Sequence, residues 1–107
     1  MVYTDRTISL KQMKELAQQV LPSSTVVLFG SRARSDFSAD SDYDFMIIAK
    51  GMLSAADKRR YKSILRKKFA EKRIPIDVLI ETEDDVDVKR NISGHIVREV
   101  MRNGIVL

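Results

Sequence analysis

Apolar residues in the first half of the chain follow two different spacings. From Ile8 to Val20 they recur every three or four positions, which predicts an amphipathic helix that ends at Leu21-Pro22. Thr25 to Phe29 is a short β-branched and apolar run that stops at Gly30, so it predicts a buried strand. Asp42 to Ala49 predicts a second strand. Beyond its first residues this strand is apolar on both sides, as is typical of a central strand.

The middle of the chain predicts a long helix followed by a third strand. Ser54-Ala55-Ala56-Asp57 has the pattern of a capping box, in which the serine and aspartate side chains bond to the first backbone N–H groups of a helix. The buried stripe expected for this helix consists of Tyr61, Ile64, Leu65 and Phe69. Ile74 to Ile80 is then predicted to be a strand, with Pro75 near its start, where a missing N–H is tolerated.

The last part of the chain predicts two short helices and a short strand. Thr82 is expected to cap an acidic helix, and Ser93 a second helix that runs to Asn103-Gly104. Residues 105–107 are apolar and predict a final strand. Helices and strands therefore alternate along the chain, which predicts an α/β (α+β) fold with a small mixed β-sheet backed by helices.

Size and composition favour one soluble domain that spans residues 1–107. A chain of 107 residues with 44% hydrophobic residues can build one small core. There is no cysteine, which excludes disulfides and thiolate metal sites. No apolar stretch approaches the about 20 residues of a membrane helix, and the N-terminus lacks the apolar core of a signal peptide. We therefore expect a cytoplasmic protein.

Charge is unevenly distributed along the chain, whose net charge is +4. Residues 57–73 contain nine lysines and arginines against Asp57 and Glu71, while residues 81–87 are rich in aspartate and glutamate. A basic helix of this kind either attracts an anionic partner or is a solvated helix face. The sequence leaves both readings open.

Three aspartates are candidate metal ligands. Residues i and i+2 of a strand lie on one face, so Asp42 and Asp44 are expected to project together. Two carboxylates at the mouth of a buried strand repel each other unless a cation lies between them, and Mg²⁺ prefers such oxygen ligands. Asp77 is a charge within an otherwise apolar strand, which is costly unless it is compensated. We expect Asp77 to join the pair.

Gly30 and Ser31 are candidate phosphate ligands. Glycine allows close approach of the backbone, and Ser31 is expected to begin a short helix through Arg32, Ala33 and Arg34. A helix N-terminus binds phosphate through its N–H groups and dipole. The arginines Arg32 and Arg34 are expected to neutralise a triphosphate.

Gly-Ser, ten residues, Asp-x-Asp and an aspartate in a later strand together form a pattern more specific than its parts. This pattern resembles the nucleotidyltransferase superfamily that includes DNA polymerase β, and more narrowly the minimal nucleotidyltransferases of bacteria and archaea. The resemblance implies a polymerase β-like fold with two Mg²⁺ ions bound by Asp42 and Asp44. It also implies that Asp77 binds one of them and activates the attacking hydroxyl, and that Gly30-Ser31 binds the β- and γ-phosphates. One departure is Ser35, where the family often has glycine.

The same resemblance implies a reaction and a partner. Minimal nucleotidyltransferases are often paired with a HEPN-domain protein, as antitoxins that transfer AMP from ATP to a tyrosine of the HEPN toxin. Two alternatives stay open: a partner-binding module without catalysis, and a small-molecule nucleotidyltransferase completed by a partner subunit. Nucleic-acid binding through residues 57–73 ranks lower, because the aromatic residues there, Tyr61 and Phe69, belong to the predicted buried stripe.

Overall fold

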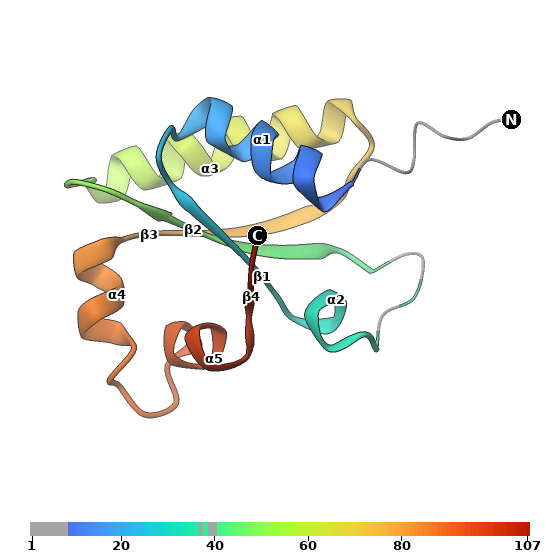
Figure 1. Ribbon diagram of the computed structural model, residues 1–107. Helices are drawn as coiled ribbons and strands as arrows, with labels where there is room; N and C mark the ends of the chain where they lie inside the picture. Colours follow the sequence, from blue (N-terminus) through green and yellow to red (C-terminus); the bar gives the residue numbers. More distant parts are fainter. Residues whose placement is uncertain (1–8, 37, 39–40) are drawn as a thin grey trace, which may run out of the picture.

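A four-stranded mixed sheet forms the centre of the protein (Figure 1). The computed structural model describes residues 9–36, 38 and 41–107. The strands are β1 (Thr25–Phe29), β2 (Tyr43–Ala49), β3 (Ile76–Thr82) and β4 (Ile105–Val106), in the spatial order β3-β2-β1-β4. β1 pairs antiparallel with β2 and with β4, whereas β2 and β3 are parallel. The predicted mixed α/β fold is therefore confirmed.

Helices cover both faces of this sheet (Figure 1). α1 (Leu10–Val20) and α3 (Ala55–Glu71) lie on one face. α4 (Glu83–Lys89) and α5 (Ile96–Asn103) lie on the other. The short helix α2 (Ser31–Arg34) follows the end of β1 and covers neither face.

The sheet separates two clusters of buried side chains. On the α1 and α3 side, Met13, Leu65 and Phe69 pack against inward residues of the strands, among them Phe45. On the α4 and α5 side, the smaller cluster consists of Val27, Met46, Ile48, Val86, Val97 and Val100. Because β2 contributes alternate residues to both clusters, it is buried on both faces, as the sequence predicts for a central strand.

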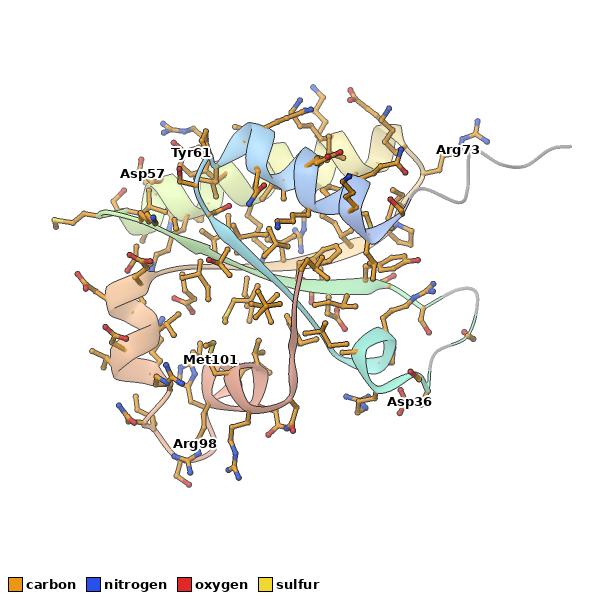
Figure 2. The ribbon with its side chains drawn as sticks, in the orientation of Figure 1. Asp36, Asp57, Tyr61, Arg73, Arg98 and Met101 are labelled. Carbon is orange, nitrogen blue, oxygen red and sulfur yellow. The ribbon has the colours of Figure 1, made fainter. Side chains whose placement is uncertain are left out.

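Within the described residues, three helices begin with a capping box, in which a hydroxyl and a later polar side chain bond to each other's backbone N–H groups. Ser54 with Asp57 begins α3, as the sequence predicts. Thr82, which the sequence predicts as a cap, begins α4 together with Asp85. Ser9 caps α1 in the same way, and the predicted start of that helix at Ile8 lies outside the described residues. Figure 2 shows Asp57 at the N-terminal end of α3, and Arg73 beyond its other end.

The bounds of β2 and β3 differ from the sequence prediction. β2 begins at Tyr43 rather than Asp42, because its pairing with β3 begins where Tyr43 faces Ile76. β3 runs from Ile76 to Thr82 rather than from Ile74 to Ile80, because its parallel pairing with β2 continues to the end of that strand. Strand partners, rather than the apolar run alone, therefore define the ends of these strands.

The start of the last helix and the burial of one residue of α3 also differ from the sequence prediction. α5 begins at Ile96 and not after Ser93, because the Nδ1 atom of His95 accepts a hydrogen bond from the backbone N–H of Val97 and caps the helix. Ile64, predicted to be buried, is 37% exposed, whereas Leu65 and Phe69 are buried. In Figure 2, Met101 lies on the sheet-facing side of α5 and Arg98 on the far side. None of the helices in the described part of the chain is long and apolar enough to span a membrane.

Candidate active site

The register of the sheet brings the predicted site residues to one end of it. Phe29, the last residue of β1, is paired with Asp44, and Asp44 is paired with Asp77. Because β1 runs opposite to β2 and β3, the end of β1 lies beside the starts of the other two strands. Gly30, Asp44 and Asp77 therefore meet at this end, although they lie far apart in the sequence.

Gly30 lies against the carboxylate of Asp44. Its φ is +74°, a conformation that residues with a side chain rarely adopt. A Cβ atom at this position would overlap Oδ2 of Asp44. Glycine is thus required twice, once by the backbone conformation and once by the neighbouring carboxylate.

The turn after Gly30 leads directly into α2. The backbone N–H groups of Ala33 and Arg34 both donate to the carbonyl of Gly30, which closes the first turn with Ser31 at its start. The first N–H groups of a helix have no acceptor within the helix, so they are suited to an anion. Ser35 ends α2 in the left-handed conformation, with φ 65°. This is the position at which the resembling family often has glycine.

The electrostatics of this end are dominated by carboxylates. Burial raises the pKa of Asp44 above its ordinary value, and the negative charges of Asp77 and Asp42 raise it further, while Arg34 acts in the opposite direction. Asp42 itself is exposed and lies just before β2. The ionised form of Asp44 is therefore destabilised by its burial and by the charges of the other two aspartates.

This donor set fits a hard divalent cation. Among residues 9–36, 38 and 41–107, no three His, Cys, Asp or Glu side chains are already gathered to hold a metal ion. However, burial raises the pKa of Asp44, and so does repulsion from Asp77 and Asp42, which a bound cation would offset; Gly30 leaves the space that the carboxylate needs. The oxygen ligands of Asp42, Asp44 and Asp77 suit Mg²⁺.

Three arginines surround the site in different ways. Arg34 forms an exposed ion pair with Asp36 at 3.2 Å. Arg32 donates to the backbone carbonyl of Ser41, and its guanidinium carbon lies 4.1 Å from the centre of the Tyr43 ring. Arg66 of α3 has Nη2 3.7 Å from Oδ1 of Asp77. No sequence signal singled out Arg66, because its contact with Asp77 exists only once α3 packs beside β3.

A cavity of about 530 Å³ opens beside Gly30, between α2 and α5. Its lining is mainly apolar, with a few polar groups that include Arg34 and Asn103. Cavities of this size and composition are typical of small-molecule sites. The end of the sheet that carries the carboxylates therefore also offers space for a ligand.

The basic helix α3 uses part of its charge within the protein. Lys58 forms ion pairs with Asp85 and Glu81, and Arg66 contacts Asp77. Phe69 is buried and Tyr61 is half-buried, so the aromatic residues of α3 are poorly placed to stack on bases.

Comparison with protein families decides the class of the chain. The model of the nucleotidyltransferase domain family matches residues 10–106, which include the Gly30 turn and all three aspartates. The chain belongs to the nucleotidyltransferase domain family. This assignment supports a transferase activity. Comparison with curated proteins gives no significant match.

Solved structures share the fold of this nucleotidyltransferase domain. A toxin–antitoxin crystal structure with AMP-PNP is 17% identical and has a TM-score of 0.63, with 92% of this chain and 72% of that chain covered. A candidate nucleotidyltransferase from Sulfolobus solfataricus is 24% identical, with a TM-score of 0.62 and coverages of 95% and 81%.

A third structure contains a tri-AMPylated HEPN toxin from Shewanella oneidensis in complex with the MNT antitoxin. It is 13% identical over 90% of this chain and 66% of that chain, with a TM-score of 0.51. At such identities the similarity establishes the fold alone. The nucleotidyltransferase fold expected from the sequence is therefore confirmed.

Proposed function

We propose that this nucleotidyltransferase transfers AMP from ATP to a tyrosine hydroxyl of a HEPN-domain toxin, with Mg²⁺ as cofactor, and so acts as its antitoxin. The observation that carries the proposal is the contact between Gly30 and the carboxylate of Asp44. This contact supports the proposal because it brings a turn suited to phosphate next to a carboxylate suited to a metal ion, as a nucleoside triphosphate with Mg²⁺ requires.

Each residue of the site has a role in this proposal. The Gly30-Ser31 turn binds the β- and γ-phosphates, and Arg34, which lines the adjacent cavity, neutralises part of their charge. Asp42 and Asp44 would hold both metal ions, and Asp77 would hold one of them. When bound, Mg²⁺ offsets the charge that develops on the attacking and leaving oxygens.

The chemical step is a displacement at the α-phosphate. The tyrosine oxygen forms a bond to the α-phosphorus while the bond from that phosphorus to the bridging oxygen of the β-phosphate breaks. Pyrophosphate leaves with the electron pair of the broken bond, and the hydroxyl proton passes to the carboxylate of Asp77. The side chain of Asp77 is 60% exposed and lies on an edge strand, so an acceptor on a separate protein can approach it.

The choice of ATP and of a HEPN toxin is supported by the solved structures with this fold. One is a toxin–antitoxin complex with AMP-PNP, and another contains an AMPylated HEPN toxin with its antitoxin. A chain of the nucleotidyltransferase domain family, with the carboxylates and the Gly30-Ser31 turn described above, is suited to such chemistry.

The test is transfer of label from ATP to a protein of the native host. Wild type, Asp44→Ala and the control Asp87→Ala, which changes an exposed aspartate on α4, are incubated with host lysate, Mg²⁺ and ATP labelled at its α-phosphate. We expect a labelled band with wild type and Asp87→Ala, its loss with Asp44→Ala, and no label from ATP labelled at its γ-phosphate. Mass spectrometry then identifies the acceptor residue.

Two results would contradict the proposal. Equal labelling by Asp44→Ala would remove Asp44 from the reaction. Absence of any labelled band, together with equal capture of a partner by wild type and Asp44→Ala, would favour a partner-binding module without catalysis.

A further inference from the structure

The two arginines of α2 differ in what they contact. Arg34 lines the cavity beside Gly30, and its charge acts on Asp44. Arg32 contacts the other side of the turn, where Nε and Nη2 donate to the carbonyl of Ser41 at 3.3 and 3.0 Å. Its guanidinium also lies over the ring of Tyr43, 4.1 Å from the centroid. Arg32 thus contacts the residue before Asp42 and the residue after it.

Those contacts matter because Asp42 lies outside the sheet. β2 begins one residue later, so no strand pairing fixes the backbone of Asp42. Ser41 is part of a local turn, in which its N–H donates to the carbonyl of Ser38 and its hydroxyl accepts from the N–H of Ser38. The bonds from Arg32 connect this turn to α2, and therefore to the phosphate-binding turn.

The stack on Tyr43 anchors the same arginine to the core. The Tyr43 ring is stacked with that of Phe45, with centroids 6.2 Å apart, and Phe45 contacts Phe69 of α3 with centroids 6.0 Å apart. Phe45 and Phe69 are fully buried. A planar guanidinium can donate two parallel bonds and stack on a ring at the same time, which an ammonium group cannot do.

We propose that Arg32 is a positioning residue that sets the place of Asp42 relative to the Gly30-Ser31 turn, rather than a ligand of the triphosphate. This inference rests on the proposed function, since it takes Asp42 to be a metal ligand. Residues that orient a metal ligand commonly change metal affinity by about 10- to 100-fold when they are replaced. Loss of Arg32 therefore weakens metal binding and leaves phosphate binding at the turn intact.

The experiment measures these two affinities separately. Mn²⁺, an oxygen-binding substitute for Mg²⁺, is titrated by electron paramagnetic resonance. Inorganic tripolyphosphate is titrated by calorimetry without metal. The variants are Arg32→Ala, Arg32→Lys, Asp44→Asn and the control Arg59→Ala, which changes an exposed arginine on α3. The Tm of each variant is recorded to establish that it is folded.

We expect Arg32→Ala to bind Mn²⁺ at least about 10-fold more weakly than wild type, with unchanged tripolyphosphate affinity. Arg32→Lys does not restore Mn²⁺ binding, and Tyr43→Phe, which keeps the ring, retains it. Weaker tripolyphosphate binding with unchanged Mn²⁺ binding in Arg32→Ala would make Arg32 a phosphate ligand and overturn the proposal. The proposal would also be overturned if Arg32→Ala bound Mn²⁺ as tightly as wild type while Asp44→Asn bound it weakly.

Failure of the proposed function gives a different result. Wild type would then bind Mn²⁺ no more tightly than Asp44→Asn, which would remove the metal site itself and the role of Arg32 with it.

Discussion

Carboxylates at the two ends of the β2–β3 pair have opposite electrostatic environments. At the first end, Asp44 is paired with Asp77, and burial together with the neighbouring carboxylates raises the pKa of Asp44. At the other end, Glu81 is buried and forms ion pairs with Lys58 at 3.6 Å and Lys89 at 2.8 Å. Beside it, the hydrogen bond from Lys58 to Asp85 lowers the pKa of Asp85 to about 2.

This contrast separates carboxylates that stabilise the fold from carboxylates that are available for chemistry. Paired with lysines, Glu81 and Asp85 connect α3 and α4 around the edge strand β3. At the end that carries Asp44 and Asp77, the repulsion between carboxylates remains, although α3 also contributes Arg66, which contacts Asp77. A carboxylate with a raised pKa beside a cavity, such as Asp44, is a candidate for a functional site. Substitutions at each end test this difference.

Gly30→Ala, at the end that carries Asp44 and Asp77, is expected to have the largest effect on stability and activity. A Cβ atom there requires an unfavourable φ and displaces Asp44. The control is Gly51→Ala, which has a similar φ of +83° but nothing within 4 Å of the added atom. We expect a loss of free energy of unfolding of about 3 kcal/mol for Gly30→Ala and about 1 kcal/mol for Gly51→Ala, measured by urea denaturation.

Activity distinguishes the two glycine variants further. Gly30→Ala should lose AMP transfer, whereas Gly51→Ala should keep it. If both variants lose the same free energy of unfolding and both stay active, the contact between Gly30 and Asp44 is of no consequence.

Glu81→Ala tests the other end, where carboxylates are paired with lysines. Its removal leaves Lys58 and Lys89 without their buried partner, but these side chains are 26% and 32% exposed and regain water. We therefore expect a loss of about 2 kcal/mol in the free energy of unfolding, below the range for a fully buried pair. AMP transfer per folded molecule should be unchanged. A loss of transfer with full stability would mean that this end is not purely structural.

Ser35→Gly is expected to have the smallest effect, a gain of about 0.5–1 kcal/mol. Ser35 ends α2 with φ 65°, a conformation that glycine adopts with less strain. Ser23, which has φ 64° in the turn between α1 and β1, offers the matched control Ser23→Gly. Both variants should gain Tm in a thermal scan and keep AMP transfer. A lower Tm for Ser35→Gly alone would show that the serine side chain contributes to the turn.

The elements of the fold were largely predictable, and the errors are at their ends. β1 was predicted with its observed bounds because a β-branched run stops at Gly30. The start of β2 and both ends of β3 depend on the register with neighbouring strands, which local sequence does not encode. Similarly, α5 begins at Ile96 because His95 caps it through its ring nitrogen.

The types of residue in the site were predictable, but their contacts were not. The Gly-Ser turn and the aspartates have recognisable spacing. However, the overlap that a Cβ on Gly30 would make with Asp44 follows from the pairing of Phe29 with Asp44. The contacts of Arg32 join α2 to Ser41 and Tyr43 at the start of β2, which local sequence does not place beside it. Roles assigned to individual arginines therefore needed the structure.

The thermal stability of wild type and Asp44→Asn, measured with and without Mg²⁺, tests whether Asp44 is part of a metal site. Because the pKa of Asp44 is raised in the folded state, its ionisation costs stability at neutral pH, and that cost disappears as the pH falls through the folded pKa. Without metal at pH 7, Asp44→Asn should therefore have the higher Tm, and the difference should shrink in acid.

Saturating Mg²⁺ should reverse this order. It should raise the Tm of wild type by several degrees, as expected for a ligand that binds only the folded state, and leave Asp44→Asn unchanged. The control Asp87→Asn should follow wild type. A wild type that is more stable than Asp44→Asn without metal, and whose Tm does not respond to Mg²⁺, would contradict a metal site at this end of the sheet.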